Sequence, residues 1–529
     1  MNSTLAPTRE QHQTYNAAVD LVERDLDVRS DRTAFVDDFR TLTYAELAEA
    51  VRRAASVLLG VGLVPEQRLI VALLDSADFP VAFLGAIRAG IVPVPVNTLL
   101  GAPDLAYILL DSRAQAAVVS AELLPKLLEA AAAADWPGKI LVSDPAGSGA
   151  AAGRMIWADA IAATPPAGAP FPSRPDDPCF WLYSSGSTGR PKGTIHAQTS
   201  MVQTADFFAR GVLGMTAHDV VFSAAKLFFA YGLGNALSFP LAVGATGVLY
   251  AGRVKADTVC RLLAEKQPTI FCGVPTLFGA CLLEPTLPSA GEHALRLCTS
   301  AGEALPAGIA TGWTKRTGVE IVDGIGSTEM LHIFVSNRPG HVVYGTTGIP
   351  VPGYRTRLID EHGNIAPPGE IGELEVSGPT AALGYWNNRE KSQRTFAGEW
   401  TRTGDKFRID ADGNYVHCGR ADDMLKVSGI WVSPAEVESA LVAHPDVLEC
   451  AVIGRADEQD LVKPKAFVVL KPGIAADAAL EARLKAHLKG CLAPYKYPRW
   501  FAFVDELPKT ATGKIRRHVL RERETPAHG

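Results

Sequence analysis

One segment in the first half of the chain combines small, hydroxylated and basic residues in a pattern suited to binding phosphate. It reads Tyr183-Ser-Ser-Gly-Ser-Thr-Gly-Arg-Pro-Lys-Gly193 and follows residues 179–182, which are typical of a buried strand. Small residues let backbone N–H groups approach an oligophosphate, the hydroxyl groups donate further hydrogen bonds, and Lys192 adds a positive charge. The segment is therefore predicted to be a phosphate-binding loop at the carboxyl end of a strand.

Three other interpretations of this segment fit less well. A Walker loop contains Gly-Lys followed by Ser or Thr, and the segment does not. Residues 186–189 also lack the G-x-S-x-G spacing of a serine-hydrolase nucleophile. A flexible serine-glycine linker is the remaining alternative, but such a linker has no reason to end in Arg-Pro-Lys-Gly.

Five further segments follow in order, and they resemble the motifs of one enzyme family. They are Asp323-Gly-Ile-Gly-Ser-Thr-Glu329, Gly372-Glu-Leu-Glu-Val-Ser-Gly378, Thr401-Arg-Thr-Gly-Asp405, Gly419-Arg-Ala-Asp-Asp-Met-Leu-Lys-Val-Ser-Gly429 and Pro508-Lys-Thr-Ala-Thr-Gly-Lys-Ile515. With the phosphate loop they resemble the acyl-adenylate-forming enzymes, which include acyl-CoA synthetases, peptide-synthetase adenylation domains and luciferases. Each motif alone is weak, but their order and spacing over nearly the whole chain make the resemblance specific.

The resemblance assigns most of these motif residues to ATP. A carboxylate that attacks the α-phosphate must overcome the repulsion between two anions, so cations have to surround the reacting atoms. Glu329 is implied to hold Mg²⁺, and Asp405 to accept hydrogen bonds from both ribose hydroxyls. The implied nucleotide-binding residues are Ser184, Ser185, Gly186, Ser187, Thr188, Gly189, Lys192, Asp323, Gly324, Ile325, Thr328, Asp405 and Arg420.

Some of these assignments have alternatives. Asp405 and Arg420 are otherwise a turn aspartate and a surface arginine. Where the family usually has an aromatic residue stacked on adenine, this chain has Ile325, which packs apolar surface on the base but makes the choice of a purine less secure. His196, which follows the phosphate loop, is interpreted as structural rather than catalytic.

The last part of the chain carries residues that the resemblance assigns to both half-reactions. Lys514 lies in a Gly-Lys turn and is implied to bridge the attacking carboxylate and the nucleotide, because a compact charge on a long stem can reach into a cleft. Its alternative is a surface lysine in the basic tail 514–517. Lys426 is implied to act in the second half-reaction, and Asp422 matches the family's hinge position. The implied CoA-binding residues are Ser428, Gly429 and Trp431.

Residues 226–235 and 323–333 look closely like those of the benzoate-CoA ligase branch of this family. The resemblance implies a short, flat, mostly apolar pocket, which suits a planar ring. The implied pocket residues are Ala230, Tyr231, Gly302, Gly326, His332 and Ile333. Packing in the core is the alternative for each of them. Hydroxy- and aminobenzoates are close rivals to benzoate, since a single side chain decides whether one added polar group is accepted.

The resemblance thus implies an ATP-dependent acid–thiol ligase that forms aryl-CoA, AMP and pyrophosphate through an acyl-adenylate, with ATP, Mg²⁺ and coenzyme A required. No carrier domain follows the last motif, so the acyl group is expected to leave on a small thiol or an external carrier. One alternative is an aryl-acid adenylating enzyme that loads a carrier protein. Another is a non-catalytic sensor of aryl acids or nucleotides, which the presence of Glu329, Asp405 and Lys514 disfavours.

Composition and charge limit the partners. The 529 residues carry 51 basic and 57 acidic side chains, a balance that is poor for non-specific nucleic-acid binding. The eight cysteines show no metal-ligand spacing, and residues 1–20 lack the apolar core of a signal peptide. The uncharged stretch 227–252 is interpreted as a buried helix running into a buried strand, because glycines and a proline interrupt it. We expect a cytoplasmic enzyme with small-molecule substrates, no nucleic-acid partner and no membrane contact, and leave open whether it forms a homodimer.

The elements that must position these residues alternate between helix and strand, which favours a mixed α/β fold with a β-rich part. A capping box at Thr43 predicts a helix to about Gly60, and residues 68–74 are typical of a buried strand. Residues 144–178 are interpreted as a surface excursion, and residues 348–415 as turn-rich β structure. A large domain, residues 1–421, is predicted to bind AMP and the aryl acid, and a small mobile α/β lid, residues 422–529, to carry Lys514.

Overall fold

The structure is a computed structural model that describes residues 14–149, 153–184, 190–421, 423–427, 430–458, 461–509 and 515–524. Its largest sheet has nine strands in the order β16-β15-β14-β13-β12-β10-β11-β1-β2. The strands are β1 Thr33–Val36, β2 Thr41–Thr43, β10 Val220–Ser223, β11 Thr246–Val248, β12 Ile270–Gly273, β13 Leu297–Ser300, β14 Ile321–Gly326, β15 Ile333–Ser336 and β16 Ile349–Pro350. The six central strands are parallel, and the strands at both edges are antiparallel.

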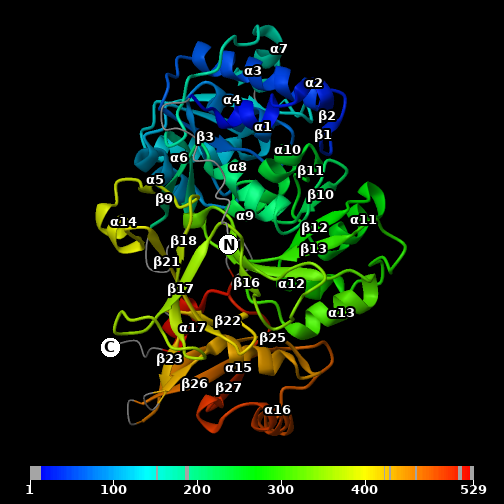
Figure 1. The fold of residues 1–529 in the computed structure, drawn as a ribbon, viewed down its shortest axis with the longest axis vertical. Helices are drawn as coiled ribbons and strands as arrows, with labels where there is room; N and C mark the ends of the chain where they lie inside the picture. Colours follow the sequence, from blue (N-terminus) through cyan, green and yellow to red (C-terminus); the bar gives the residue numbers. More distant parts are fainter. Residues whose placement is uncertain are drawn as a thin grey trace, which may run out of the picture.

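A second sheet is parallel throughout and has the order β4-β3-β5-β6-β7. Its strands are β3 Arg68–Ala72, β4 Val92–Pro95, β5 Ala116–Ser120, β6 Lys139–Ser143 and β7 Met155–Ile156, and its flanking helices are α3 Tyr44–Gly60, α4 Asp78–Arg88, α5 Ala102–Ser112 and α6 Leu124–Ala133. The predicted capping box of α3 is present, with Thr43 and Glu46 bonded to each other's backbone. Every residue of α4 is buried, because this helix lies in the core beneath α3 (Figure 1).

Two antiparallel sheets complete the large region of the molecule. One joins β8 Pro178–Ser184, β9 Lys192–Ala197 and β19 Gly384–Tyr385. The other contains β17 Arg355–Ile359, β18 Gly372–Ser377, β20 Phe396–Ala397, β21 Trp400–Ile409 and β22 Tyr415–Arg420. The remaining helices of this region are α1 Ala17–Val22, α2 Leu26–Arg29, α7 Trp157–Ala163, α8 Ser200–Thr204, α9 Ala230–Leu233, α10 Phe239–Val243, α11 Ala256–Lys266, α12 Pro275–Cys281, α13 Ala307–Thr317 and α14 Arg389–Thr395.

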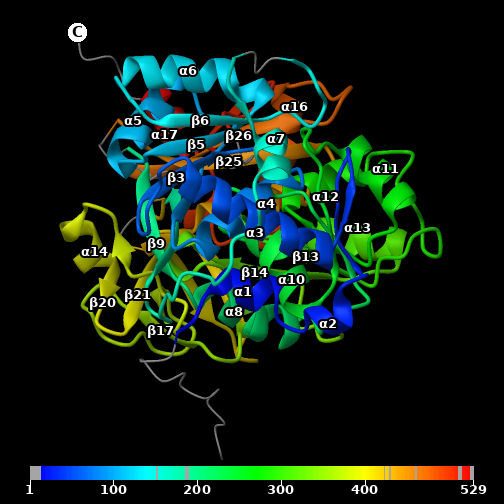
Figure 2. The ribbon, with the colours of Figure 1, turned by 90° about the horizontal axis from the view of Figure 1, so that it is seen from above.

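The C-terminal part of the chain forms a smaller α/β unit, which lies at the opposite end of the molecule's long axis from α3 (Figure 1). Figure 2 shows the same ribbon from above, so that α16 and β26 of this unit lie farther from the viewer than the five-stranded sheet. The unit contains β23 Leu425–Val427, β24 Ile430–Val432, α15 Pro434–Val442, β25 Val447–Ala456, β26 Val462–Leu470, α16 Ala478–Cys491, β27 Trp500–Phe503 and α17 Arg517–Glu524. It has a core of its own, in which Leu441, Val452 and Leu484 are fully buried or nearly so. The division after residue 421 stays a prediction, since Asp422 lies outside the described residues.

Most of the predicted elements are confirmed, and one prediction is wrong. The stretch 227–252 is a helical segment followed by β11, and no described helix is long and apolar enough to cross a membrane. Seven cysteines are buried and Cys491 is exposed, all as free thiols. Residues 144–178 are not only a surface excursion, because β7 extends the five-stranded sheet and Trp157 is fully buried at the start of α7. The prediction followed the alanine-rich composition of the segment and gave no weight to Trp157.

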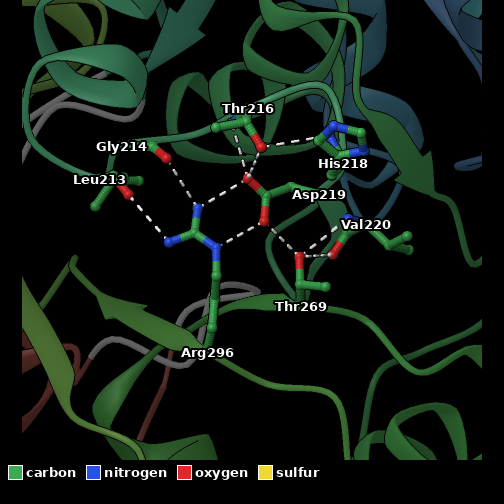
Figure 3. A network of polar contacts seen from close by, with 8 residues as sticks. All are labelled: Leu213, Gly214, Thr216, His218, Asp219, Val220, Thr269 and Arg296. Carbon is green, nitrogen blue, oxygen red and sulfur yellow. Dashed lines mark hydrogen bonds and ion pairs between the residues drawn. The ribbon is translucent and has the colours of Figure 1, made fainter.

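An ion-pair network around the buried carboxylate of Asp219 ties together the amino-terminal ends of the central strands, with Arg296 reaching it from the surface (Figure 3). Asp219, directly before β10, accepts two hydrogen bonds from Arg296, at 2.7 and 2.8 Å. The Thr269 hydroxyl (2.7 Å) and the Thr216 N–H (2.8 Å) also donate to its carboxylate. Burial alone raises the pKa of Asp219, but these donors together lower it below the ordinary value. The network therefore holds an ionised carboxylate with both oxygens fully occupied.

Candidate active site

The phosphate loop connects two paired strands. Ser184 at the end of β8 lies opposite Lys192 at the start of β9, so the hairpin brings the two ends of the loop together. Ser185, Gly186, Ser187, Thr188 and Gly189 lie outside the described residues, and their predicted contacts with phosphate stay predictions. His196, on β9, is fully buried against the ring of Phe180, and burial lowers its pKa to about 4. A neutral ring packed on a core phenylalanine agrees with the structural interpretation of His196.

Lys192 and Glu329 form an ion pair together with a tyrosine that the sequence did not single out. The Lys192 Nζ lies 2.8 Å from Glu329 Oε1 and 2.7 Å from the Tyr385 hydroxyl. The Tyr385 hydroxyl in turn donates to the same Oε1 at 2.7 Å. Burial opposes ionisation of Glu329, but Lys192 and Tyr385 outweigh it and hold its pKa below the ordinary value. The cluster of Lys192, Glu329 and Tyr385 thus keeps a buried carboxylate charged.

The donor set at Glu329 is suitable for the magnesium ion that the sequence implied. Mg²⁺ prefers oxygen ligands, usually one or two carboxylates supplemented by substrate phosphates. Both side-chain hydrogen bonds to Glu329 fall on Oε1, so Oε2 is the oxygen that remains for a cation among the contacts of the described residues. Thr328 begins the short 3-10 turn Thr328–Met330 that carries Glu329, and the Ser327 hydroxyl accepts from the Met330 N–H at its start. The turn places the carboxylate beside Lys192.

The next residue along the chain, Leu331, has a backbone conformation that is rare for a branched residue. Its φ is 67° and its ψ is −44°. The His332 N–H donates to the Met330 carbonyl at 2.9 Å, which closes a γ-turn centred on Leu331. Such a conformation costs about 1–3 kcal/mol and persists only where the surroundings impose it. The Leu331 side chain is 2% exposed, so core packing holds the turn between Glu329 and His332.

The predicted pocket residues Tyr231 and His332 are neighbours in a largely aromatic environment. Their ring centroids are 5.5 Å apart, and the His332 ring also packs edge-on against Phe239 at 4.4 Å. Burial lowers the pKa of His332 to about 3, so the imidazole is neutral at physiological pH. Its Nε2 lies 3.4 Å from the Tyr231 carbonyl, and its Nδ1 has no hydrogen-bond partner among the described residues.

Two glycines permit this close packing. A Cβ at Gly234 would lie 2.3 Å from His332 Cδ2, and one at Gly326 would lie 2.5 Å from the His332 carbonyl oxygen. The Tyr231 hydroxyl makes a 2.7 Å hydrogen bond with Thr299 Oγ1 at the end of β13. Among the other predicted pocket residues, Ile333 is 1% exposed, Ala230 is partly buried at the start of α9, and Gly302 has a φ of +96° in the loop after β13.

The predicted ribose-binding residues lie on two paired strands. Asp405 on β21 is opposite Arg420 on β22, with Arg420 Nη1 3.1 Å from Asp405 Oδ2. The second carboxylate oxygen has a partner that the sequence did not suggest, because His417 Nε2 lies 3.5 Å from Asp405 Oδ1. Gly404 has a φ of +72°, and a Cβ there would meet Arg420 Nη2 at 2.8 Å. Asp405 is buried on a strand rather than in a turn, Arg420 is exposed, and their roles at the ribose stay predictions.

The remaining predicted nucleotide residues follow one strand. Asp323, Gly324 and Ile325 lie consecutively on β14, and Ile325 pairs with Val335 of β15. Burial raises the pKa of Asp323 well above its ordinary value, although the Gly324 N–H and Ser300 oppose this. Its Oδ1 has no hydrogen-bond partner among the described residues. A buried carboxyl oxygen of this kind is suited to a polar ligand atom.

The residues predicted to act from the C-terminal unit are only partly described. Lys426 on β23 lies 3.2 Å from Glu361, which follows β17, and both side chains are about half exposed. Asp422, Ser428, Gly429 and Lys514 lie outside the described residues, and Trp431 is described only as a backbone position on β24. Their roles in catalysis, in CoA binding and at the hinge stay predictions.

Comparison with known proteins identifies the family. Residues 22–386 match the AMP-binding enzyme family, and residues 436–514 match the AMP-binding enzyme C-terminal domain. The chain belongs to the AMP-binding enzymes. It is 55% identical to the benzoate–CoA ligase of Thauera aromatica over 98% of both chains. It is 49% identical to the 4-hydroxybenzoate–CoA/benzoate–CoA ligase of Rhodopseudomonas palustris over 96% of this chain and 94% of that one.

A solved structure shows the same likeness for the fold of this AMP-binding enzyme. The crystal structure of a benzoate CoA ligase from Burkholderia xenovorans superposes with a TM-score of 0.90 at 50% identity, over 96% of this chain and 100% of that one. The likeness confirms the mixed α/β fold with a large N-terminal and a smaller C-terminal domain. It also confirms the family that the motif order predicted.

The structure of this AMP-binding enzyme adds partners that short motifs could not reveal. Tyr385 and His417 lie outside the segments used for the prediction, and each contacts a carboxylate from a different strand or turn. Their only sequence signal is a polar ring side chain in a short strand, which is too common to select. The sequence located Glu329 and Asp405, whereas the tertiary fold was needed to find the ring side chains beside them.

Proposed function

We propose that this AMP-binding enzyme is a benzoate–CoA ligase, which activates benzoate as benzoyl-adenylate and transfers the benzoyl group to coenzyme A. The observation that carries the proposal is the 55% identity with the Thauera aromatica benzoate–CoA ligase over 98% of both chains. The surroundings of Tyr231 and His332 support it. A neutral imidazole among aromatic rings suits the planar, uncharged ring of benzoate better than a flexible chain or a second charged group.

The first half-reaction joins two anions, and the residues of the site are suited to that task. The benzoate carboxylate attacks the α-phosphorus of ATP, and pyrophosphate leaves. We propose that Lys192 and the phosphate loop hold the polyphosphate, that Asp405 and Arg420 hold the ribose, and that Asp323 contacts the adenine side. Glu329 would hold Mg²⁺, which supplies positive charge to the leaving pyrophosphate when bound. The proximity of these fixed charges lowers the cost of bringing the two anions together.

A pyrophosphate-release assay over a panel of acids tests the choice of substrate. We expect kcat/KM to be highest for benzoate, lower for 4-hydroxybenzoate, and far lower for acetate and octanoate, because the short apolar pocket that the family resemblance implies would exclude the long chain and give acetate few contacts. Preference for an aliphatic acid would contradict the proposal. The acceptor is tested by product analysis with free CoA against a pantetheinylated carrier protein, where faster loading of the carrier would favour the alternative function.

We propose that the C-terminal unit rotates between the two half-reactions, so that Lys514 acts in the first and Lys426 in the second. Lys514→Ala should lose about 10²–10³ in the rate of adenylate formation, as is typical when a preorganised donor is removed. It should still convert supplied benzoyl-AMP to benzoyl-CoA. Asp422→Pro should do the reverse, because proline fixes φ near −65° and would hold the predicted hinge in one state. Equal effects on both half-reactions would contradict the assigned roles.

The cellular location and the oligomeric state accompany this proposal. We propose that the enzyme acts in the cytoplasm, since its substrates ATP and CoA are abundant there, and cell fractionation with an activity assay tests this. We also propose that it can assemble as a homodimer. Light scattering during size-exclusion chromatography distinguishes a homodimer from a monomer.

A further inference from the structure

Two of the proposed pocket residues lie in the first turn of a helical segment whose start is not capped. Helix α9, Ala230–Leu233, runs directly into the π-helical turn Gly234–Ser238 and then into α10, and the residue at its start, Phe229, makes no capping hydrogen bond with its side chain. The first turn of a helix leaves backbone N–H groups without partners inside the helix. Contacts of the residues that precede this turn therefore help to place Ala230 and Tyr231.

One such contact is a buried carboxylate from the other large sheet. Asp75 follows β3 of the five-stranded sheet and is 4% exposed. Its Oδ1 accepts a hydrogen bond from the Leu227 N–H at 3.2 Å, and its Oδ2 lies 3.8 Å from Lys226 Nζ. Lys226 and Leu227 immediately precede the turn that starts α9. Asp75 thus contacts the pocket segment through both the backbone and a charged side chain.

The ammonium group of Lys226 extends this link to the nine-stranded sheet. It donates hydrogen bonds to the carbonyls of Tyr250 and Gly252, the latter at 2.7 Å, just beyond β11. Asp75 and Lys226 together therefore connect the loop after β3, the start of the pocket segment and the segment after β11. From Lys226 the backbone passes the constraint to α9, because the Phe229 N–H donates to the Lys226 carbonyl and the Leu233 N–H to the Phe229 carbonyl, at 3.0 and 2.7 Å.

The Asp75 side of this link is a fixed point. The Leu74 N–H donates to Ser120 Oγ at 3.0 Å, and the Ala77 N–H donates to Asp37 Oδ2 at 2.7 Å. The Ser76 N–H closes a tight turn on the Leu74 carbonyl at 2.8 Å. The residues on both sides of Asp75 are thus bonded to different elements, so its carboxylate has little freedom to follow a moving partner.

Stability does not explain a carboxylate at this position. Burial raises the pKa of Asp75 to about 6, and the opposing effects of Lys226 and the Leu227 N–H do not restore the ordinary value. A group whose folded pKa is raised lowers the stability of the fold as pH rises from its ordinary pKa through the folded value. Ionisation of Asp75 at neutral pH is therefore a cost to the fold, which its contacts with Lys226 and the Leu227 N–H only partly offset.

We propose that Asp75 is a positioning residue for the aryl acid: it holds Lys226 and the Leu227 N–H, and through them sets the place of Ala230 and Tyr231 in the pocket. The inference rests on the proposed aryl-acid site. It assigns to Asp75 no contact with the acid itself, and it predicts a loss of fit for the ring without a loss of nucleotide binding.

The test compares Asp75→Asn and Asp75→Ala with Asp78→Asn in the full-length enzyme. Asp78 lies three residues further on and is also buried, but its carboxylate bonds to Arg40 and Ser143, away from the pocket segment. Asparagine keeps an acceptor for the Leu227 N–H and removes the negative charge facing Lys226. We expect Asp75→Asn to raise KM for benzoate about 5- to 10-fold, because the ion pair with Lys226 is lost and the hydrogen bond from the Leu227 N–H is no longer made to a charged acceptor, with KM for ATP within about twofold. Asp78→Asn should leave both KM values within about twofold.

Three further measurements separate positioning from a structural role. The melting temperature of Asp75→Asn should equal or exceed that of the wild type, whereas loss of a structural bond would lower it. The preference for benzoate over 4-hydroxybenzoate should shrink in Asp75→Asn, because a loosened pocket discriminates less. Lys226→Met should raise KM for benzoate as well, and the double variant with Asp75→Asn should be less than additive.

Equal rises in both KM values, or a lower melting temperature with unchanged KM values, would overturn the proposal. If Asp75→Ala does not fold, Asp75→Asn and Lys226→Met carry the test. Should the wild type prefer another acid to benzoate, the same comparison is made with that acid, so that a wrong substrate and a wrong role for Asp75 give different results.

Discussion

Two buried carboxylates beside the same nine-stranded sheet are surrounded in opposite ways. Asp219 lies at the amino-terminal ends of the parallel strands, and Arg296, Thr269 and the Thr216 N–H occupy both of its oxygens (Figure 3). Glu329 follows the carboxyl end of β14, and the two side-chain donors that it receives from the described residues share one oxygen. Both groups are held ionised below their ordinary pKa.

The difference shows how a buried charge indicates function. A carboxylate with a full set of protein donors has no capacity left for a ligand, and its loss damages the fold. A carboxylate that has an oxygen without a donor among the described residues has room there for a ligand, and ligands of α/β sheets bind at the carboxyl ends of the strands. We therefore expect variants of Asp219 to reduce stability and variants of Glu329 to reduce activity.

The largest effect should come from Glu329→Gln. The amide keeps the volume of the side chain but removes the charge that we assign to Mg²⁺, so adenylate formation should fall by about 10²–10³. The free energy of unfolding should fall less than in the Asp219 variant below, because Lys192 keeps its hydrogen bond to Tyr385 when its ion pair with Glu329 is lost. Pyrophosphate release at saturating benzoate and urea titration measure the two quantities. A stable protein with near-normal activity would remove Glu329 from the catalytic site.

Asp219→Ala should show the opposite profile. The substitution removes the carboxylate that accepts from Arg296 and from two further donors, which should cost about 2–3 kcal/mol of unfolding free energy. The kcat/KM of the folded protein should stay within about twofold. The matched control is Glu265→Ala, which breaks the exposed helical pair with Arg261 and should cost only about 0.3–0.5 kcal/mol. Comparable losses in the two variants would show that burial adds nothing to the Asp219 network.

Tyr385→Phe should give a smaller, purely kinetic effect. The phenyl ring keeps the contact below the Lys192 ammonium, which lies 4.0 Å from the ring centroid, but it loses the hydroxyl that bonds Glu329. Lys192 still neutralises Glu329, so we expect about a tenfold lower rate of adenylation, corresponding to one hydrogen bond to a charged group. Rapid-quench measurement of benzoyl-AMP formation decides this, and a rate unchanged within twofold would make the hydroxyl dispensable.

The smallest effect should be a difference in pH dependence between Asp219 and Asp75. The pKa of Asp219 is lowered in the fold, so its contribution to stability is present above its ordinary pKa and is lost as pH falls through the folded value. The advantage of the wild type over Asp219→Asn should therefore shrink toward acid pH. The pKa of Asp75 is raised to about 6, so the unfolding free energy of the wild type should rise relative to that of Asp75→Asn as pH falls through 6. Urea titrations between pH 7 and pH 4 measure both, and parallel trends would contradict the signs.

Sequence alone was sufficient for the family, the fold class and most elements, because these depend on local patterns. The capping box at Thr43 set the start of α3, and the glycine-interrupted stretch 227–252 became a helical segment and a strand. The motif order predicted the family that full-length likeness confirms. Such features are written in neighbouring residues, where spacing carries the information.

Contacts between sheets were beyond local patterns. Tyr385 is 56 residues from Glu329, and Asp75 is 152 residues from Leu227, so no spacing rule connects them. The error at residues 144–178 has the same origin, since the burial of Trp157 depends on β7 joining a sheet whose other strands come earlier. The roles of Lys514 and of the phosphate-loop residues 185–189 remain predictions from the motif alone.

The γ-turn at Leu331 gives the proposed site a fixed length. Glu329 stands at one side of this turn and His332 at the other, and a buried leucine in a strained conformation joins them. His332 and Glu329 therefore cannot move apart without breaking the turn. Their separation limits the distance between the ring and the carboxylate of an acid that the proposed site accepts. An acid with a methylene inserted between the two, such as phenylacetate, cannot be accommodated by sliding His332 outward, because Glu329 would move with it.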